Sequence, residues 1–509
     1  MRTVLIAVVV SLGGFLFGFD ASVISGVIGF VTPQFGLSEI EQGWVVSSPT
    51  FAAIFAMFSG TISDWFGRRK ILIFTAFLYA LSAFMSALAP SYEVLVIARM
   101  IGGLAFGAAL VLAPIYIGEL APADMRGKLV SIMQLNIVLG FSASYFSNFF
   151  ILQLLGDGGV MTEETVWRWM LGVEFVPALL YLFLLFIVPK SPRWLIAKGR
   201  DEEALKSLAK LYNEDEAKEE LSRIKTSLES TQSSSESQGW LELFTKPMKL
   251  ILVLGFTLAI VQQITGINSI LFYANTIFEQ SGIGKNAAFA QAIWVGLVQV
   301  IFTIVTMVFI DRWGRRPLML TGLAGIALSM LIVFIGFNNA TYQLNSVDAK
   351  EIGLPVEAVA GITDQDFNSD VEFKRSLRSA LGDEAYLQNE SAILERSVTM
   401  NAWLILIGIL GFMASFSLSV GPVMWVLFSE IFPARIKGIA FAVFGFTNSA
   451  TSFLVQLVFP WEIANLGSAL SYLIFGLFAV LGLVVLAKYL PETKGKSLEE
   501  LEKVVVNNG

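Results

Sequence analysis

The chain has 509 residues and a formal net charge of −7; 55% of its residues are hydrophobic and only 15% are charged. So few charges could not cover the surface of a soluble protein of this length, and the negative net charge gives no indication of nucleic-acid binding. The sequence has no Cys and no His, which excludes disulfides, thiolate metal sites and imidazole proton relays, so any proton chemistry must run through carboxylates. We expect no metal site and no cofactor.

Apolar runs follow one another along the whole chain. A hydrocarbon core of about 30 Å requires about 20 apolar residues for each spanning helix. The first run is too long for a signal peptide, although Arg2 precedes it. The sequence therefore predicts an all-α integral membrane protein with twelve transmembrane helices. The twelve runs are 3–31, 41–63, 70–89, 92–118, 127–152, 168–188, 249–280, 287–310, 317–337, 399–430, 435–459 and 466–489.

An acid lies inside the first apolar run, in the stretch GGFLFGFDASVISG. An ionised carboxylate such as Asp20 costs about 2.5–3.5 kcal/mol or more at the centre of a bilayer, so something must compensate it. The fourth run carries a matching cation, Arg99, which is the only charge between Glu93 and Glu119. A static buried salt bridge and a proton-coupling pair would look the same in the sequence.

The short loops between the runs set the predicted orientation. SDWFGRRK, DRWGRRP and PARIKG are basic and follow the second, eighth and tenth runs. Basic loops stay in the cytoplasm, so we expect both termini and the segment 190–249 to be cytoplasmic and the acidic segment 338–397 to be external. The first segment shows the pattern of short amphipathic helices, and the second contains a possible helix around FKRSLRSALGDEAYL.

Two motifs occur twice. DWFGRR at 64–69 returns as DRWGRR at 311–316, an offset of 247 residues, and ELAPADMRG at 119–127 returns as EIFPARIKG at 430–438, an offset of 311. The growth of the offset places an insertion in the second half, which matches 338–397. Two pseudo-symmetric six-helix halves joined by a linker resemble the major facilitator fold. The expected domains are an N-terminal half at 1–189, a cytoplasmic linker at 190–248, a C-terminal half at 249–490 containing the insertion, and a cytoplasmic tail at 491–509.

Each repeated loop combines an acid, a glycine and two arginines. The glycine permits a tight turn, and the arginines can dock onto carboxylates and onto the carbonyl ends of neighbouring helices, with Glu119 and Glu430 as natural partners. A role in topology alone would not explain the paired acids. The residues of this predicted cytoplasmic gate are Asp64, Gly67, Arg68, Arg69, Glu119, Arg126, Asp311, Gly314, Arg315, Arg316, Glu430 and Lys437.

The stretch QQITGIN opens the seventh run and holds three amides within seven residues. Unwinding at Gly266 would bring Gln262, Gln263 and Asn268 towards one cavity. Amides suit sugars because each offers both a donor and an acceptor to a hydroxyl. The alternative is that the amides only form hydrogen bonds between neighbouring helices, each worth about 0.6 kcal/mol. Three neighbouring amides exceed that need.

Taken together, the motifs resemble the signature set of the sugar porter family of the major facilitator superfamily. They occur in family order over nearly the whole chain, and the type is most similar to bacterial xylose–proton and plant hexose–proton symporters. The motifs are GGFLFGFD, SDWFGRR, RMIGGLAFG, YIGELAPADMRGKLVS, SPRWL, QQITGIN, DRWGRRPL, GPVMWVLFSEIFP and PETKGKSLEEL.

The resemblance implies roles for individual residues. Asp20 and Arg99 match an acid–arginine pair that couples protons to transport, and the loop ion pairs hold the cytoplasmic gate shut in the outward-open state. Phe141, Phe272 and Ser449 depart from the sugar-site pattern of the xylose symporter, and Lys190 replaces a usual Glu. The residues implied in sugar binding are Phe17, Gln134, Gln262, Gln263, Asn268, Gln299, Trp425 and Asn448.

The resulting expectation is a monomeric secondary transporter of a bacterial cytoplasmic membrane. It would import a monosaccharide with a proton by alternating access, with membrane lipids as its other partners. A facilitative sugar uniporter and an inositol–proton symporter are alternatives on the same scaffold, and a transporter-like sugar sensor is a third. An enzyme is not expected. The sequence names neither the sugar nor the role of 338–397.

Overall fold

The computed structural model describes residues 2–121, 125–155, 161–232, 243, 248–432 and 436–496. Contacts between Cα atoms divide the chain into two compact units. The first unit is Met1–Asp20, Ser48–Phe141 and Leu171–Gly239, and the second is Ala21–Ser47, Ser142–Met170 and Trp240–Gly509. The division into halves at 1–189 and 249–490 stays a prediction, and parts of the 190–248 linker and of the 491–509 tail lie outside the described residues.

Twelve helical spans in the described part of the chain are long and apolar enough to cross a membrane. One falls on each predicted run, so the all-α membrane fold is confirmed. The spans are Thr3–Phe35, Glu39–Phe66, Arg68–Ala87, Tyr92–Leu120, Ser131–Gln153, Val166–Leu185, Lys249–Phe272, Lys285–Trp313, Arg315–Asn338, Ala402–Ile431, Lys437–Leu466 and Ser468–Tyr489.

Four helices contribute residues to both units: α1 (Arg2–Phe35), α2 (Glu39–Phe55), α6 (Arg126–Gln153) and α7 (Val166–Gly172). The other elements of the first unit are η1 (Ala56–Phe58), α3 (Ser59–Phe66), α4 (Arg68–Ala87), α5 (Tyr92–Leu120), α8 (Phe175–Leu185), α9 (Pro192–Ala197), α10 (Asp201–Leu208) and α11 (Glu214–Gln232).

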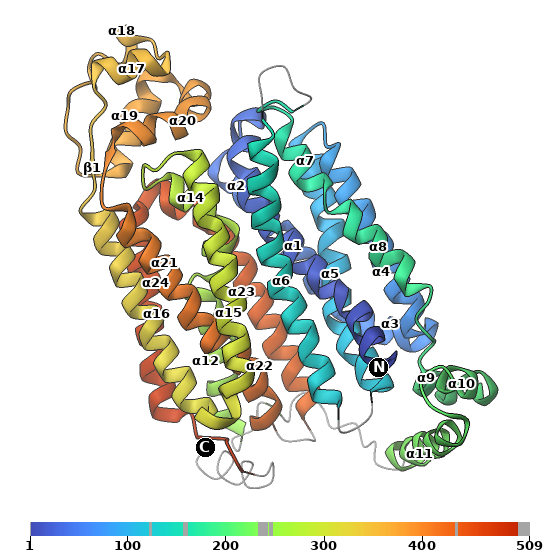
Figure 1. The fold of residues 1–509 in the computed structure, drawn as a ribbon. Coiled ribbons are helices and arrows are strands. Elements are labelled where there is room, and N and C mark those ends of the chain that lie inside the picture. The colour runs from blue at the N-terminus through green and yellow to red at the C-terminus, as the bar shows by residue number, and fades with distance from the viewer. Residues whose placement is uncertain are drawn as a thin grey trace. The chain divides into compact units, whose positions relative to one another are not determined.

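The other elements of the second unit follow in chain order, and most of them are labelled in Figure 1. They are α12 (Lys249–Ile264), α13 (Ile267–Phe272), α14 (Ala274–Glu279), α15 (Lys285–Trp313), α16 (Arg315–Asn338), β1 (Thr341–Tyr342), α17 (Ser346–Ile352), α18 (Val356–Val359), α19 (Asp370–Leu381), α20 (Asp383–Ser397), β2 (Val398–Thr399), α21 (Ala402–Leu418), α22 (Val420–Ile431), α23 (Lys437–Leu466) and α24 (Ser468–Tyr489).

Glycines define three sharp turns that the sequence predicts. Gly67 and Gly314 have φ angles of 94° and 89° and separate α3 from α4 and α15 from α16. Gly266, with φ 92°, separates α12 from α13. Only glycine adopts this backbone region without strain, so the predicted tight loops and the predicted break in QQITGIN are both confirmed.

In the first unit, α4 packs on α5 and on α8. Helix α5 also packs on η1, and small residues let the two approach closely: a Cβ on Gly107 would lie 2.6 Å from that of Ala56. Such contacts supply van der Waals packing between helices whose outer faces meet lipid. Tyr79 and Tyr181 fill the interior and are fully buried.

In the second unit, α16 packs on α21 and α24, and α12 packs on α23 and α24. The break after α12 is packed tightly, because a Cβ on Gly266 would lie 2.5 Å from the ring of Phe475. This fixed irregular turn faces the protein interior, where a non-helical backbone is tolerated at membrane depth. It positions the amides of QQITGIN.

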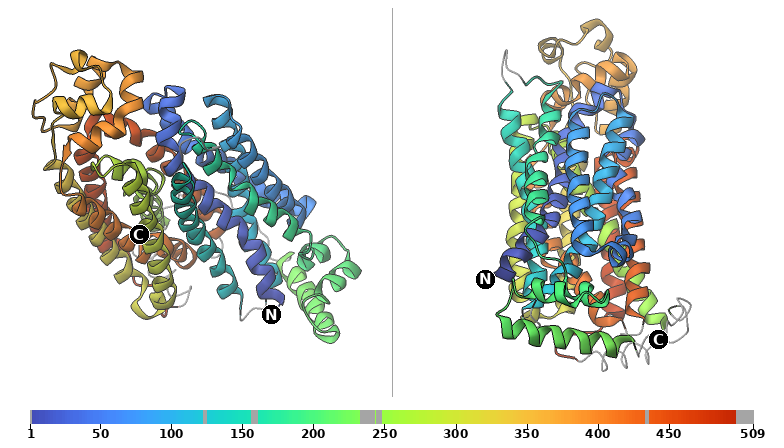
Figure 2. Two further views of the ribbon diagram at one scale, coloured as in Figure 1. Left: turned by 45° about the horizontal axis from the view of Figure 1, so that its top comes forward. Right: turned by 90° about the vertical axis from the view of Figure 1, so that its right-hand side faces the viewer.

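The insertion forms a small cluster of its own. The antiparallel pairing of Thr341 with Thr399 brings its two ends together, and Phe373, Leu377 and Tyr386 are among its buried core residues. Figure 1 shows α17 to α20 gathered beyond the ends of α16 and α21, and both views of Figure 2 keep them together. The helix expected around FKRSLRSALGDEAYL is split, because Gly382 adopts φ 79° between α19 and α20.

The described part of the linker confirms the expected short helices α9, α10 and α11. The side-chain oxygen of Ser191 accepts a hydrogen bond from the backbone N–H of Trp194 and so caps α9, which has Pro192 at its first position. Buried Ala204 and Leu208 form the apolar side of α10. Helix α10 packs on α9 and α11, and α9 contacts α5.

Candidate functional site

A buried ion pair lies in the first unit, where α1 meets α5. Arg99 Nη1 lies 3.3 Å from Asp20 Oδ1, and the two side chains are 1% and 5% exposed. Nothing in the described part of the chain forms a hydrogen bond with the second carboxylate oxygen, Asp20 Oδ2, which is buried. Gly102 leaves room beside it, because a Cβ there would lie 2.6 Å from Ser82 Oγ and 3.6 Å from Asp20 Oδ2.

A second buried acid accompanies this pair, and the sequence analysis missed it. Glu174 is 3% exposed and lies at the start of α8, within the first unit. It interacts electrostatically with both Asp20 and Arg99. The signal was present as an isolated charge in the run WRWMLGVEFVPALL. Two acids and one arginine therefore share one desolvated site.

The second unit contains a connected network of amides. Asn268 donates to Gln263 Oε1 over 2.8 Å, and Gln263 donates to Gln262 Oε1 and to Asn448 Oδ1 over 3.2 Å each. Asn448 in turn donates to Gln262 Oε1 over 2.7 Å. The turn at Gly266 makes this possible, because it brings the amides on both sides of the break in α12–α13 to one place.

The network continues along α23. Asn268 also donates to Ser452 Oγ over 2.6 Å, and Gln456 donates to the same hydroxyl over 2.8 Å. Gln299 on α15 is 6% exposed, and its Oε1 accepts no hydrogen bond from the described residues. Trp425 on α22 is 44% exposed, and its ring meets Phe428 edge-on, so the structure does not join it to the network.

Two of the residues predicted to bind sugar belong to the first unit. Phe17 on α1 packs against Phe106 and Phe141, with ring centroids 4.8 and 6.0 Å away. Phe141 is therefore part of an aromatic cluster and not a polar position. Gln134 is half-buried on α6.

The first predicted gate motif forms a compact ion-pair cluster. Arg68 bridges Asp64 and Glu119, and its Nη2 lies 3.1 Å from Glu119 Oε1. Arg69 donates to the carbonyls of Leu185 and Phe186 at the end of α8. Arg126 begins α6, but its side chain lies outside what the structure describes.

The second gate motif repeats this arrangement in the second unit. Arg315 lies 2.9 Å from both Asp311 Oδ1 and Glu430 Oε1. Arg316 donates to the carbonyl of Ala487 near the end of α24 over 2.8 Å. Lys437 donates to the carbonyl of Ser429, which lies next to Glu430.

The two ion-pair clusters differ at one position, which is Glu492 in the second unit and Lys190 in the first. The Glu492 carboxylate accepts hydrogen bonds from the backbone N–H groups of Arg315 and Arg316 at 3.1 Å each. In the corresponding motif PKS of the first unit, Lys190 instead pairs with Glu203 over 2.9 Å. A Cβ on Gly67 would meet the ring of Trp194, which covers the first turn from the other side.

The chain combines twelve helices long enough to span a membrane with two copies of an arginine-bearing loop. Its buried polar sites lie on broken or glycine-rich helices. This combination defines a secondary transporter of the major facilitator class. The family profile described as "Sugar (and other) transporter" matches residues 6–355 and 385–505. This chain belongs to that sugar transporter family. The match passes over residues 356–384, which lie within the insertion.

Individual relatives agree with this assignment. The chain is 36% identical over 504 residues to the arabinose-proton symporter of Bacillus subtilis (strain 168), covering 98% of this chain and 94% of that protein. It is 31% identical over 506 residues to the major myo-inositol transporter IolT of the same organism, covering 99% and 94%. Among solved structures, the inward open conformation of the xylose transporter XylE from E. coli superposes with a TM-score of 0.74 at 31% identity, covering 98% of this chain and 99% of that one.

Proposed function

We propose that this protein imports a monosaccharide together with a proton across a bacterial cytoplasmic membrane by alternating access. It works as a monomer with both termini in the cytoplasm, surrounded by membrane lipids, and catalyses no chemical reaction. The observation that carries the proposal is the desolvated pair of Asp20 and Arg99, whose side chains are 5% and 1% exposed.

Asp20 is the proton carrier in this proposal. A buried pair held at 3.3 Å with one unpartnered carboxylate oxygen has a site where a proton can bind without displacing another donor. Protonation would remove the charge that Arg99 compensates and would free the first unit to rearrange. One proton moving down 100 mV supplies about 2.3 kcal/mol, enough to concentrate a neutral sugar about fifty-fold.

The amide network is the proposed sugar site. Gln262, Gln263, Asn268 and Asn448 hydrogen-bond to one another. Sugar hydroxyls can replace these bonds one for one, because each amide both donates and accepts. Gln299, whose oxygen lacks a partner among the described residues, and Trp425, Gln134 and Phe17 complete the proposed set.

The repeated ion-pair clusters are the proposed cytoplasmic gate. Arg68 and Arg315 are each 13% exposed and each bridge two acids. Half-buried pairs of this kind suit a lock with two discrete states, because they must break together when the helices separate.

The deciding experiment uses proteoliposomes that contain the purified protein. Uptake of labelled L-arabinose, D-xylose, D-glucose and myo-inositol is measured with and without an imposed inward proton gradient. We expect one monosaccharide to accumulate only with the gradient and to equilibrate without it. Equal uptake with and without the gradient would support a facilitative uniporter. Binding without any uptake would support a sugar sensor.

Inositol is the second candidate substrate, because the chain is 31% identical to a myo-inositol transporter over nearly its whole length. The same uptake panel decides between the two. If myo-inositol accumulates with the gradient and no monosaccharide is taken up, the proposed substrate changes to a cyclic polyol. The proposed coupling mechanism stays the same.

A further inference from the structure

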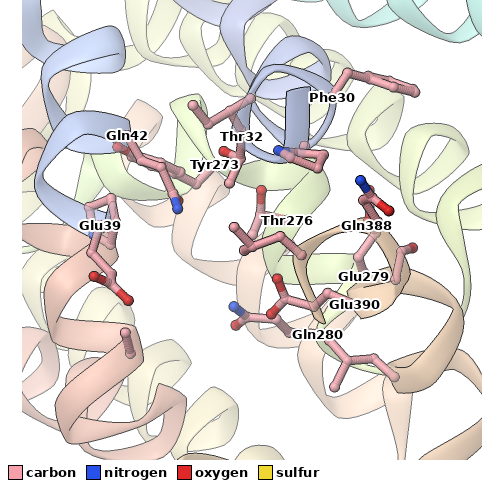
Figure 3. A pocket seen from close by; sticks show the side chains of 18 of the residues that line it. Phe30, Thr32, Glu39, Gln42, Tyr273, Thr276, Glu279, Gln280, Gln388 and Glu390 are labelled. Carbon is pink, nitrogen blue, oxygen red and sulfur yellow. The ribbon is translucent and has the colours of Figure 1, made fainter. Parts of the chain in front are cut away.

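A cavity of about 740 Å³ lies within the second unit, beside the insertion. Its walls come from the end of α1, the start of α2, α14, the start of α15, α19, α20 and the end of α23. The volume falls within the range of about 300–1,000 Å³ that is usual for small-molecule sites. Figure 3 shows polar side chains from several of these elements around one space, among them Gln42, Thr276 and Gln388.

Some of the charges around the cavity are paired. Arg378 of the insertion lies 2.8 Å from Glu39 at the start of α2. Lys374 lies 3.5 Å from Glu390, which also accepts a 2.9 Å hydrogen bond from the Tyr386 hydroxyl. The paired groups present strong acceptors and donors to the hydroxyls of a ligand. Three further acids on the wall are exposed to solvent: Glu163, Glu164 and Glu384.

Glu279 on α14 is an acid on the wall whose carboxyl group is buried. It faces Lys285 and accepts a hydrogen bond from Ser391 of the insertion. Burial raises the pKa of the Glu279 carboxyl above its ordinary value, against the opposing charge of Lys285. A buried carboxylate is poorly hydrated, so a hydrogen bond from a ligand hydroxyl stabilises it more than the same bond would stabilise a carboxylate at an open surface.

One wall of the cavity is aromatic. Phe30, Tyr273 and Phe459 line it and are 6%, 3% and 1% exposed. The Lys285 ammonium lies over the Phe30 ring, 4.4 Å from its centroid, so Tyr273 and Phe459 are the rings left to contact the C–H face of a sugar. The described residues contain no group of three acidic side chains placed to hold a metal ion.

We propose that this cavity is an outer binding site for a neutral polyhydroxylated ligand of monosaccharide size, of the same class as the transported substrate. The proposal rests on the proposed function, because it makes the outer cavity a capture site for that substrate. The insertion builds one side of it through Arg378, Gln388 and Glu390. Residues 356–384 of the insertion lie outside the family match, so part of this wall is an addition to the common scaffold.

The test compares variants that leave the amide network unchanged. Gln388 is exposed on the cavity wall, and Thr276 is half-buried there. Gln388→Ala combined with Thr276→Val removes one amide and one hydroxyl. Gln343→Ala is the matched control, because this exposed amide of the insertion does not line the cavity. Each full-length protein is assayed in proteoliposomes for uptake of L-arabinose, D-xylose, D-glucose and myo-inositol over a range of concentrations, and in nanodiscs for equilibrium binding of the same compounds.

We expect the double variant to raise the KM of the transported compound about tenfold with an unchanged maximal rate, and to lose one class of binding site. Gln343→Ala should match the wild type. An unchanged KM and binding curve in the double variant overturns the outer site while leaving the proposed function intact. An equal change in Gln343→Ala also overturns it, because the effect would then belong to the insertion as a whole. A wild-type protein that transports none of the four compounds overturns the proposed function and this proposal with it.

Discussion

Arg99 Nη1 and Asp20 Oδ1 lie 3.3 Å apart between α5 and α1, in a site from which solvent is almost excluded. Glu174 interacts electrostatically with both, so the single arginine serves two acids. The charge of either acid therefore affects the interaction of the other with Arg99, and Glu174 belongs with Asp20 in any test of proton coupling.

Replacing Asp20 by Asn tests the coupling directly. Asn keeps the size and hydrogen-bonding capacity of the side chain but cannot take up or release a proton. We expect Asp20→Asn to bind sugar and to exchange it in counterflow, while accumulation against a gradient is lost. Sugar-induced alkalinisation outside vesicles, measured alongside counterflow, reports both properties.

A matched control for this variant is Asp383→Asn, at an exposed acid that begins α20. It should retain full coupling. Losing the anion beside Arg99 should also lower the stability of the Asp20→Asn protein by part of the about 3–5 kcal/mol typical of a broken buried pair. Sugar-driven proton movement that persists in Asp20→Asn would show that the pair is structural.

The amide network predicts a loss of affinity without a loss of folding. Gln263 takes part in three of the amide–amide hydrogen bonds, through Gln262, Asn268 and Asn448. Gln263→Ala should weaken equilibrium sugar binding about fivefold or more, since each lost hydrogen bond costs about 1 kcal/mol. Asn465→Ala, at an exposed amide near the end of α23, should bind sugar as the wild type does. Equal affinities in the two variants would place the sugar elsewhere.

Local features of the fold could be predicted from the sequence. The lengths of the apolar runs predicted the twelve spans. The glycines at 67, 266 and 314 predicted turns, because only glycine adopts the backbone conformation of these positions without strain. The cost of a charge in lipid singled out Asp20 and Arg99, which the structure places together. The same reasoning applied to the sixth run would have found Glu174.

Features that depend on distant partners could not be predicted in this way. The bond from Asn448 to Gln262 requires the register of α23 against α12, and periodicity within either helix carries no such information. The pairing of Thr341 with Thr399 joins segments on either side of the insertion. The cavity beside the insertion has the same origin, because its walls come from seven separate helices.

The paired ends of the insertion make it removable. Thr341 and Thr399 lie opposite each other in the β1–β2 ladder, so a short Gly/Ser linker can replace residues 343–397 without stretching α16 or α21. The insertion has its own buried core, and the spans that carry Asp20 and the amide network lie outside it. We expect the shortened protein to transport sugar with a raised KM and, because the Arg378–Glu39 pair is lost, a lower thermal stability.

Uptake against sugar concentration measures this effect, and cell-surface labelling checks that the shortened protein is inserted. A correctly inserted protein that takes up none of the tested compounds would contradict the prediction. It would show that the insertion is part of the transport cycle itself.

The two copies of the repeat allow a matched comparison at one position, which is Glu492 in the second unit and Lys190 in the first. Glu492 caps the start of α16 through two backbone N–H groups at 3.1 Å each, and Thr493 Oγ donates to Glu430 over 2.6 Å. At the matching position in the first unit, Lys190 and Glu203 form a pair whose side chains are 41% and 39% exposed. Exposed pairs contribute about 0–1 kcal/mol, whereas a carboxylate that accepts from a helix N-terminus is held by charge-assisted bonds and by the helix dipole.

Glu492→Gln should therefore destabilise the protein by about 1–2 kcal/mol, while Lys190→Gln, at the equivalent place in the repeat, should change its stability little. Gln keeps one acceptor oxygen, so one of the two backbone bonds survives, and the loss comes from the second bond and from the negative charge at the positive end of α16. Thermal unfolding of the two purified variants, followed by tryptophan fluorescence, measures the difference. Since Glu492 also anchors the turn that carries Arg315, uptake should show a faster but less tightly coupled cycle in Glu492→Gln alone. Equal melting temperatures for the two variants would mean that the cap at α16 contributes no more than the exposed pair at Lys190.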